Sequence, residues 1–540
     1  FFQMNKCLFF VLFLLPILSF SQSFTESNLP IVVISTEWIE IPNEPKIPGT
    51  MKIIDNGPGM INHPDDPGNV YDGGIGIEIR GSFSASLPQK PYSIETRDAL
   101  QNELDVSLFG WPEESDYVLL ANYNDKVFMR NVLAFYLSNE MGHYASRTRF
   151  CEVVVNDQYK GIYVFGEKIK RDKGRVNIAK LEPDEISGEP LTGGYIFKCD
   201  YWTSSDSWQS PYHPIDHPDF DVRFVYYVPK HEDLVAQQKT YIKDFVSAYE
   251  QALYSDHFDD PAAGYRPYIN TTSFVDYFIV NELARNNDGF KKSYYFFKDR
   301  DGIDKRINSG PVWDFDWAWK NIDECQIFAA TDGSGWAHLV NDCWPDNNSP
   351  GWQVRLLQDT AFANETRCRW DLLRQDLLNS DTLHAWIDRN VALLQEAQER
   401  HYMRWPILGL NVGTPVVGPI PATWEGEIAD FKRWIDLRLA WLDANIPGTC
   451  WTTAVDDPEQ SHALIFPNPT SDYAYIEWPN HAMVAAPELF NSNGEKVIVS
   501  SQMASGTAKL DFSGLHQGFY LIRVSDASGK TQWLKISIIR

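Results

Sequence analysis

The sequence predicts an α+β protein with a bilobal body and a small β-sandwich at its C-terminal end. Short strand patterns fill residues 50 to about 200, and long helical patterns dominate from about 231 onward. Short strands return after about residue 452, where the composition changes. A strand-rich first half, a helical second half and a polar hairpin between them indicate two lobes of different composition.

Residues 1–22 have the layout of a signal peptide. In "MNKCLFFVLFLLPILSFSQ" a lysine precedes an apolar run, and small and polar residues follow it. The run is too short and wrongly flanked for a membrane-spanning helix, and no second run is long enough to cross a membrane. We therefore expect an exported protein without a membrane-spanning segment in the mature chain. Residues 23–49 are expected to form an entry strand, "LPIVVIST", and a Pro-rich linker.

The body is expected at residues 50–446 and begins with strands. Alternating segments separated by Gly, Asn and Asp turns predict them: "GIGIEIRG", "PYSIETRD", "CEVVVNDQYKGIYVFGEKI" and "GGYIFKCD". One helix interrupts these strands, "DKVFMRNVLAFYLSNEMG". Its apolar residues have helical spacing, and Gly142 is its stop signal.

Helices dominate the second half of the body. Four segments predict them: "HEDLVAQQKTYIKDFVSAYEQALY", "NTTSFVDYFIVNELARN", "DTLHAWIDRNVALLQEAQERHYMRW" and "WEGEIADFKRWIDLRLAWLDANI". The stretch from Asn286 to Trp319 lies between the second and the third of them. It holds an aspartate in a polar loop, a predicted hairpin and then two aspartates among large aromatic residues.

A polar linker at residues 447–461 leads to a predicted β-sandwich at residues 462–540. Short strands occur at regular intervals in "LIFPNPTSDYAYIEWP", "PELFNSNGEKVIVS", "AKLDFSGLHQGFYLIRVSD" and "KTQWLKISIIR". Turn signals such as Asn493-Gly494 separate them. This pattern is typical of a small sandwich of antiparallel sheets.

Charge and cysteine usage exclude some classes of function. The net charge is −26, whereas nucleic-acid binding needs a basic surface, so we expect no nucleic-acid partner. The cysteines form no CxxC pair and the histidines no HExxH spacing, which argues against a zinc site. The six cysteines after the signal peptide permit disulfides in an exported chain. Cys325 and Cys343, which flank a Gly-rich loop, are the favoured pair.

Three aspartates, Asp288, Asp314 and Asp316, indicate phosphoryl transfer. Burial of a carboxylate among tryptophans is costly, and a metal ion would compensate for it. Phosphoryl transfer needs a metal on the phosphates, a carboxylate that orients the attacking hydroxyl and a cation on the other phosphates. Magnesium prefers one or two carboxylates together with phosphate oxygens and waters. In kinases the base precedes a hairpin and the metal aspartate follows it, and Asp288 and Asp314-Phe315-Asp316 have that order.

The C-terminal segment resembles the type A C-terminal sorting domain of the type IX secretion system of Bacteroidota. The matching features are Phe466-Pro467-Asn468-Pro469, the Asn493-Gly494 turn, "GLHQGFYLIRV" and a terminal strand with Lys535. The resemblance covers the whole tail. It implies the type IX secretion machinery as a partner, and a protein that is secreted or attached to the outer surface.

Residues of about 50–446 resemble the CotH kinase family, the atypical kinases similar to spore coat protein H. The similar segments follow one another in the family's order: "IEIRGSFSASLPQKPYSIE", "LLANYNDKVFMRNVLAFYLSNEMG", "VVVNDQYKGIYVFGEKI", "NNDGFKKSYYFFKDRDG…VWDFDWAW", "RWDLLRQDLL" and "EIADFKRWIDLRLAWLDANI". The resemblance implies a diverged kinase-like fold that uses ATP and Mg (or Mn). It implies transfer of the ATP γ-phosphate to a Ser or Thr hydroxyl of a protein substrate.

The resemblance also implies roles for individual residues in the catalytic stretch. Asp288 would orient or deprotonate the acceptor hydroxyl, Asp314 would hold the metal, and Asp316 would assist it or support it structurally. The sequence departs from the family pattern at Ser293, where an asparagine is usual. A serine hydroxyl there is a weaker and shorter metal ligand. A second departure is Ser82-Phe83, where the family has asparagine after Arg-Gly.

Contacts to the nucleotide are expected from the strand-rich half. Lys90 lies beside the predicted strand "PYSIE" and is the first candidate for the phosphates, because a compact ammonium suits them. Arg80, next to Gly81, is the second candidate. Glu167 ends a strand where kinases place the hinge to the second lobe, so its expected role is nucleotide contact or lobe packing.

Several of these residues have plainer alternatives. Asp288 in "RNNDGF" is also good turn chemistry, and Asp314 and Asp316 are equally compatible with helix capping or buried hydrogen bonds. In "KDRDG" a hairpin turn is favoured over a calcium loop, because the downstream bidentate Glu is missing. Arg130 is expected to form a salt bridge between the lobes.

A second function stays open on the sequence alone: a catalytically weak or inactive kinase-like protein that acts as a surface, structural or carbohydrate-associated binding protein. The aromatic segments "WDFDWAWK" and "GWAHLVNDCW" suit a surface or structural module that stacks on sugars, although core packing is the commoner fate of such residues. The two functions differ in one expectation. A kinase brings Lys90, Asp288 and Asp314 together in one polar cleft, whereas a binding module exposes Trp faces elsewhere.

Overall fold

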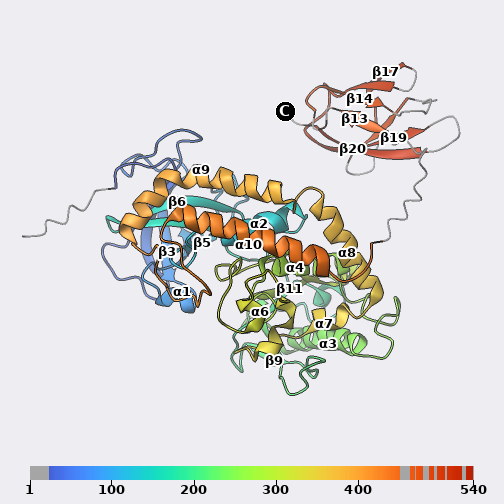
Figure 1. Ribbon diagram of the computed structural model, residues 1–540, viewed down its shortest axis with the longest axis horizontal. Coiled ribbons are helices and arrows are strands. Elements are labelled where there is room, and N and C mark those ends of the chain that lie inside the picture. The colour runs from blue at the N-terminus through green and yellow to red at the C-terminus, as the bar shows by residue number, and fades with distance from the viewer. Residues whose placement is uncertain are drawn as a thin grey trace, which may run out of the picture. The chain divides into compact units, whose positions relative to one another are not determined.

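The computed structural model describes residues 24–450 and, further along the chain, residues 463–466, 468, 470–477, 486–491, 496–504, 507–525 and 531–538 (Figure 1). The chain divides into two compact units, Phe1–Cys450 and Trp451–Arg540. The expected signal peptide, most of the expected linker and the Asn493-Gly494 turn lie outside the described residues.

The first part of the larger unit is a closed barrel of seven strands in the order β1-β2-β3-β4-β5-β7-β6. The strands are β1 (Ile31–Ser35), β2 (Ile47–Ile54), β3 (Tyr71–Ile79), β4 (Tyr92–Arg97), β5 (Asp116–Ala121), β6 (Thr148–Val155) and β7 (Gln158–Glu167). Side chains alternate between the inside and the outside of a barrel along each strand. In β7, Tyr163 and Phe165 belong to the interior core, whereas Ile162 and Val164 belong to the core outside the barrel. The alternating sequence patterns therefore specify two buried surfaces.

Strand β1 is part of this barrel, although the sequence suggested a separate entry segment at residues 23–49. It pairs antiparallel with β2 and parallel with β6. Without β1 the strands β2 and β6 would have free edges, so β1 closes the barrel.

A second sheet of five strands follows, in the order β12-β11-β8-β10-β9. Its strands are β8 (Tyr195–Cys199), β9 (Ser207–Gln209), β10 (Arg223–Val228), β11 (Tyr294–Lys298) and β12 (Ile307–Ser309). The expected hairpin is present as β11 and β12, with the short helix α5 (Asp301–Asp304) in its turn. In that turn Lys298 Nζ lies 2.7 Å from Asp301 Oδ1.

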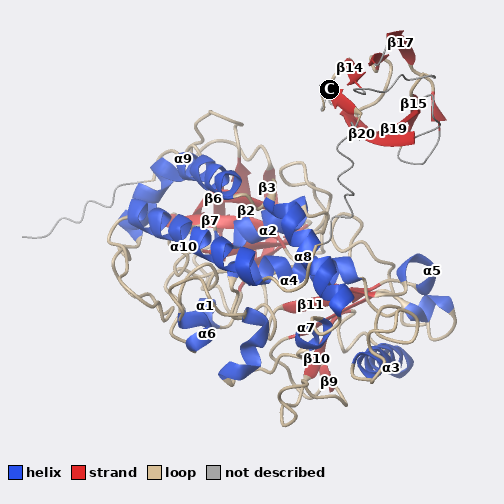
Figure 2. Ribbon diagram, turned by 45° about the vertical axis from the view of Figure 1, so that its right-hand side comes forward, coloured by secondary structure: helices blue, strands red, loops and turns tan. Residues whose placement is uncertain are grey.

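Long helices cover these sheets (Figures 1 and 2). They are α2 (Arg130–Glu140), α3 (Ala236–Leu253), α4 (Thr271–Ala284), α8 (Thr360–Arg374), α9 (Ser380–Arg404) and α10 (Trp424–Asn445). The short helices are α1 (Phe83–Ser86), α6 (Gln326–Ala329), α7 (Trp352–Leu356) and the 3₁₀ segments η1 (Glu189–Thr192) and η2 (Ala337–Cys343). All of α4 from Ser273 to its end is buried, including the polar residues Asp276, Asn281 and Glu282.

Helix α2 begins later than the sequence pattern suggested. The pattern "DKVFMRNVLAFYLSNEMG" starts at Asp125, but Phe128 has a φ of +65°, which a right-handed helix cannot contain. The backbone N–H of Arg130 donates to Asp125 Oδ2 (2.9 Å), so the aspartate holds a turn in front of the helix. Gly142 has a φ of +94° after the last turn and ends the helix as expected.

Helix α9 packs closely on the outside of the barrel at β7. Gly161 of β7 has a φ of +95°, and a Cβ atom there would lie 2.7 Å from His401 Nδ1. The absence of a side chain lets the backbone N–H of Ile162 donate to His401 Nδ1 (3.1 Å). Burial lowers the pKa of His401 to about 3, so the ring is neutral and accepts this hydrogen bond.

Two disulfides occur in the larger unit, Cys325–Cys343 and Cys368–Cys450. The first confirms the pair favoured by the sequence. Cys151 and Cys199 are buried free thiols.

The described residues of the smaller unit form two four-stranded sheets, β13-β14-β18-β17 and β16-β15-β19-β20. Their strands are β13 (Leu464–Phe466), β14 (Tyr473–Glu477), β15 (Glu488–Phe490), β16 (Lys496–Val497), β17 (Ser500–Ala504), β18 (Thr507–Asp511), β19 (Gly518–Ser525) and β20 (Thr531–Ile538). Both sheets contribute to one core, which includes Ile476 and Leu510 from the first and Ile522 and Ile536 from the second. The expected mixture of α and β structure and the strands of the tail are thus confirmed, and the kinase-like arrangement of two lobes stays a prediction.

Candidate functional site

The segment Asp314-Phe315-Asp316 is held by residues in front of and within α2. Asn131 Oδ1 accepts a hydrogen bond from the backbone N–H of Phe315 (2.8 Å), and the amide of Asn124 donates to Asp316 Oδ2. The segment "NYNDKVFMRN" therefore positions the two aspartates. Sequence reasoning gave this segment as part of a helix and of a family pattern, and did not predict its contacts with the aspartates.

Arg130 takes part in the same support. Its Nη1 lies 2.5 Å from Asp125 Oδ1, its Nε donates to the carbonyl oxygen of Ala318 (3.1 Å), and its guanidinium lies over the ring of Phe431 in α10. The ion pair of Arg130 is therefore with Asp125, a near neighbour in the sequence. The contacts of Arg130 with Ala318 and Phe431 are the ones that join α2 to distant segments.

The loop that carries Asp288 is tied to the same segment through Asn286. The amide of Asn286 donates to the carbonyl oxygen of Asp314 (3.1 Å), and its Oδ1 accepts from the backbone N–H of Asp288 (3.2 Å). Gly289 follows at a point of close approach, since a Cβ atom there would lie 2.0 Å from Asn281 Oδ1. Glycine is needed in "NDG" because α4 passes so close to this loop.

The structure brings Asp288, Asp314, Asp316 and Ser293 together. The hydroxyl of Ser293 donates to Asp314 Oδ2 (3.3 Å). Burial, together with the charges of Asp316 and Asp288, raises the pKa of Asp314 well above its usual range. Asp314 also has a φ of +69°, which costs energy in a residue other than glycine. Partly buried, mutually repelling carboxylates in a strained segment are typical of a functional site rather than of a plain turn.

Asp288 has one oxygen that lacks a hydrogen-bond donor. Its Oδ1 is buried and accepts no hydrogen bond from the described residues, and the ammonium groups of Lys291 and Lys292 lie 3.4 and 3.7 Å away. Burial raises the pKa of Asp288, the two lysines oppose this, and Glu324 and Asp316 add to it. This oxygen can accept a hydrogen bond, and then a proton, from an incoming hydroxyl group.

Cations from the barrel and from the second sheet approach this cluster. Arg80, just after β3, lies 5.4 Å from the ring centroid of Trp313, the neighbour of Asp314. Lys198 of β8 lies 2.6 Å from Asp200 Oδ2 and 5.4 Å from the ring centroid of Tyr295. Burial raises the pKa of Tyr295, the charges of Asp200 and Asp314 add to this, and Arg80 opposes it, so these three groups lie near one ring.

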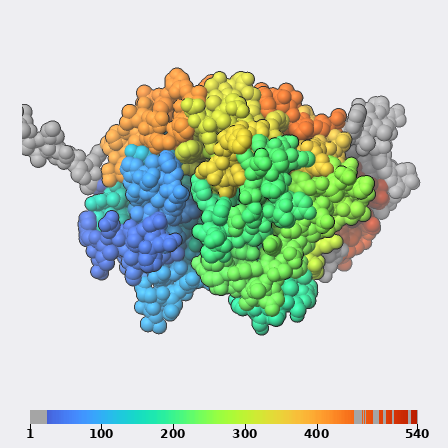
Figure 3. Space-filling model, turned by 90° about the horizontal axis from the view of Figure 1, so that it is seen from below, coloured from blue at the N-terminus to red at the C-terminus, as the bar shows by residue number. Residues whose placement is uncertain are grey.

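Lys168 is a third cation of this group. Burial lowers the pKa of Lys168, Asp116 opposes this, and the nearby positive charges of Lys46 and Arg80 add to it. Figure 3 shows the barrel (blue) beside the central part of the chain (green), with an indentation between them at one edge. The sequence pointed to Arg80 but not to Lys168, Lys198 or Asp200. The polar end of the strand "YIFKCD" was the only signal for the last two.

The other two expected nucleotide contacts have different surroundings. The ammonium group of Lys90 donates to the carbonyl oxygen of Ala85 (2.8 Å), and no contact between Lys90 and the three aspartates is described. Glu167 is fully buried and accepts hydrogen bonds from the backbone and the guanidinium of Arg147 (2.9 and 2.7 Å). Arg175 lies 3.7 Å from the same carboxylate. These contacts favour the packing role for Glu167 over nucleotide contact.

The aspartate cluster has the chemistry of a magnesium or manganese site. Among the described residues, no group of three or more His, Cys, Asp or Glu side chains is arranged to hold a metal ion. Magnesium, however, needs only one or two protein carboxylates when phosphate oxygens supply further ligands. Asp314, with Asp316 and the Ser293 hydroxyl beside it, offers oxygen donors only, and its raised pKa reflects negative charge without a counter-ion. These residues therefore fit the ion.

A cavity of about 220 Å³ lies near this site. It is lined by Met141 and His143, which follow α2, by Asp276 and Tyr277 of α4, and by the segment up to Val312, two residues before Asp314, among others. The aspartates themselves do not line it.

Two family models match parts of this sequence. A family model described as "CotH kinase protein" matches residues 77–442, and one described as "Secretion system C-terminal sorting domain" matches residues 464–539. No curated protein matches the sequence. Among solved structures, CopC from Methylosinus trichosporium OB3b matches with 15% identity over 14% of this chain and 91% of that chain. Its TM-score of 0.12 is too low to support an argument. No helix in the described part of the chain is long and apolar enough to cross a membrane.

Proposed function

Because the chain belongs to the CotH kinase family, we propose that it is an exported atypical protein kinase that transfers the γ-phosphate of ATP to a Ser or Thr hydroxyl of a surface or secreted protein. The sorting domain makes the type IX secretion machinery a partner, and the protein is secreted or attached to the outer surface. The single observation that carries the proposal is Asp288 Oδ1, which is buried near Asp314 and accepts no hydrogen bond from the described residues.

In the proposed reaction Asp288 is the base. The acceptor hydroxyl donates a hydrogen bond to Asp288 Oδ1, and its oxygen attacks the γ-phosphorus of ATP. The bond from the γ-phosphorus to the β–γ bridging oxygen breaks, ADP leaves, and the hydroxyl proton passes to Asp288. Burial raises the pKa of Asp288 toward the working pH, which makes proton transfer to this carboxylate more favourable.

Asp314 is proposed to hold Mg or Mn, with Asp316 and Ser293 as its nearest oxygen-bearing neighbours. The bound ion would neutralise charge on the β- and γ-phosphates. Arg80, Lys168 and Lys198 are proposed to bind the remaining phosphate oxygens, and Lys90 is kept as a fourth candidate. Arg80 is supported by its position beside Trp313, and Lys198 by its position beside Tyr295. Lys168 is supported by the effect of the Arg80 charge on its pKa.

The test is a phosphotransfer assay with the mature chain, γ-labelled ATP, magnesium or manganese, and casein as a generic acceptor. We expect Asp288→Asn and Asp314→Ala to reduce labelling by about a hundredfold or more. Asp157→Asn, in the exposed β6–β7 turn, is the matched control. Equal labelling by the wild type and Asp314→Ala would remove the proposed mechanism.

A second candidate function is carbohydrate binding at the surface. Trp313 and Trp319 are buried, but Tyr201, Trp202 and Trp344 expose 52%, 48% and 75% of their surface. Exposed aromatic faces of this kind suit stacking on sugar rings. If Asp314→Ala still binds glycans and Trp344→Ala does not, the result would support carbohydrate binding and not the kinase function.

A further inference from the structure

Glu324 holds the loop of Asp288 from one side. Its Oε2 accepts a hydrogen bond from the amide of Asn287 (2.8 Å), and its Oε1 lies 2.8 Å from Lys291 Nζ. Lys291 has only 1% of its side chain exposed, and its ammonium group also lies 3.4 Å from Asp288 Oδ1. Glu324 therefore fixes the residues on both sides of Asp288.

Asp346 and Asn347 hold the same loop from another segment. Asp346 Oδ2 lies 2.9 Å from Lys292 Nζ, and Asp346 Oδ1 lies 3.8 Å from Lys291 Nζ. The amide of Asn347 donates to the carbonyl oxygen of Lys291. The loop is thus bound by side chains from two segments that are separate in sequence.

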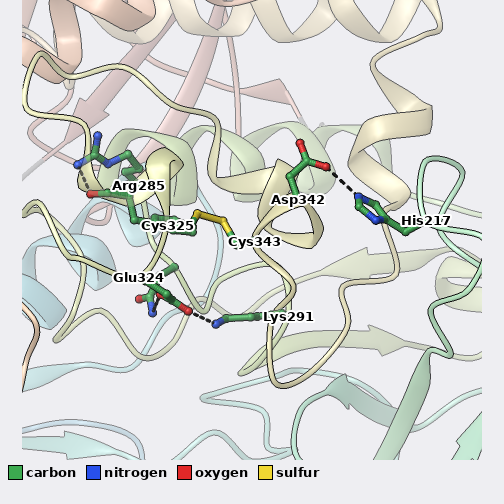
Figure 4. The surroundings of a disulfide bond; sticks show 9 residues. His217, Arg285, Lys291, Glu324, Cys325, Asp342 and Cys343 are labelled. Atoms are coloured by element: carbon green, nitrogen blue, oxygen red, sulfur yellow. Dashed lines mark hydrogen bonds and ion pairs between the residues drawn. A yellow bond between two sulfur atoms is a disulfide. The ribbon is translucent and has the colours of Figure 1, made fainter.

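The Cys325–Cys343 disulfide joins these two segments next to the residues that bind the loop. Cys325 directly follows Glu324, and Cys343 lies three residues before Asp346. Figure 4 shows the disulfide together with the contact between Glu324 and Lys291. The bond limits how far Glu324 and Asp346 can move apart, so it limits how far the loop can open.

We propose that the Cys325–Cys343 disulfide, acting through Glu324 and Asp346, positions Asp288 for catalysis, so that the enzyme becomes fully active only after oxidation outside the cytoplasm. This inference rests on the proposed kinase function. In the oxidation step the two thiols lose two protons and two electrons to an oxidant of the disulfide class, which is reduced to two thiols, while the Cys325–Cys343 bond forms. Glu324 and Asp346 are positioning residues, since they act on Asp288 through Asn287, Lys291 and Lys292.

The backbone on either side of the loop explains why it needs such support. Arg285 and Ser293, before and after the loop, have φ values of +43° and +47°. Residues other than glycine occupy this region only when the surroundings hold them there. The reduced protein is therefore expected to lose the loop conformation before it loses the fold.

The test compares two double variants of the full mature chain. Cys325→Ser/Cys343→Ser removes the proposed device, and Cys368→Ser/Cys450→Ser, which removes the other disulfide, is the matched control. Hydrogen exchange measured by mass spectrometry reports on residues 286–293 without any need for activity. We expect exchange in this segment to become about tenfold faster, and kcat to fall about tenfold or more with little change in KM for ATP, in the first variant only.

Unchanged exchange at residues 286–293 in Cys325→Ser/Cys343→Ser would overturn the inference. Faster exchange in both double variants would overturn it too, because the effect would then be general destabilisation. If no protein transfers phosphate but the exchange difference is present, the disulfide still positions the loop and only the kinase function fails. Exchange and phosphotransfer thus separate the two proposals.

Glu324→Gln gives a second, independent readout in the oxidised protein. The negative charge of Glu324 contributes to the raised pKa of Asp288. Its removal is expected to move the acidic limb of the pH–rate profile to lower pH, which a merely structural role would not do. A lower rate with an unchanged profile would contradict a direct influence of Glu324 on Asp288.

Discussion

The contact between α9 and the barrel makes the stability of the body depend on pH through His401. Burial lowers the pKa of this histidine from 6.5 to about 3, and the neutral ring accepts the hydrogen bond from Ile162. The unfolded chain therefore binds a proton that the folded chain excludes between these two pH values. The contribution of neutral His401 to the free energy of unfolding is fully present above about pH 6.5, and it is lost as the pH falls.

The size of this effect follows from the two pKa values. Between about pH 7.5 and about pH 5 the unfolded state gains roughly 2 kcal/mol from protonation of His401, while the folded state gains almost nothing. The variant His401→Gln keeps a side-chain oxygen that can accept from the N–H of Ile162 but does not titrate.

Urea unfolding of the mature wild type and of His401→Gln at both pH values, followed by tryptophan fluorescence, measures this difference. The carboxyl groups titrate in both proteins and cancel in the comparison. We expect the free energy of unfolding to fall by about 2 kcal/mol more in the wild type than in the variant. An equal fall in both proteins would show that His401 is protonated in the folded state, and the reasoning would be refuted.

Three further predictions concern buried positions. Asp314→Asn should raise the free energy of unfolding at neutral pH by about 1–2 kcal/mol, because the raised pKa of Asp314 means that its charge destabilises the fold. The same variant should lose phosphotransfer. A lower melting temperature would contradict this prediction. Gly161→Ala should cost about 2–4 kcal/mol in thermal or urea unfolding, because of its positive φ and its contact with His401, and an unaffected protein would show that α9 can move away. Glu282→Gln should lower the free energy of unfolding by about 3–5 kcal/mol, because it leaves the fully buried Arg438, 2.9 Å away, without its ion pair. We expect the double variant Glu282→Gln/Arg438→Met to recover part of this loss. No recovery would argue against the importance of the ion pair.

Much of the local structure could be predicted from the sequence. The two-residue alternation in "KGIYVFGE" and the helical spacing of "NTTSFVDYFIVNELARN" depend only on near neighbours, and both elements, β7 and α4, are present at these places. The start of α2 could not be predicted in this way, because apolar Phe128 continues the helical pattern while its backbone leaves it. Side-chain patterns do not report a local reversal of φ.

The arrangement of the site was only partly predictable. The order of Asp288, the hairpin and Asp314 along the chain was sufficient to expect the aspartates together. Lys198 and Asp200 could not be found because their place depends on the register of β8 with β11, which sets Lys198 opposite Tyr295. Long-range strand register is not encoded in any single segment. The same holds for β1, whose parallel partner β6 lies about 120 residues later.

The closure of the barrel by β1 determines which fragments of this protein are suitable for expression. A fragment cut at the limits of the family match, 77–442, would lack β1, β2 and most of β3 and would also omit Cys450, the partner of Cys368. It would present unpaired strand edges to solvent and would tend to aggregate. Soluble material for crystallisation or enzymology should therefore begin before Ile31 and extend beyond Cys450.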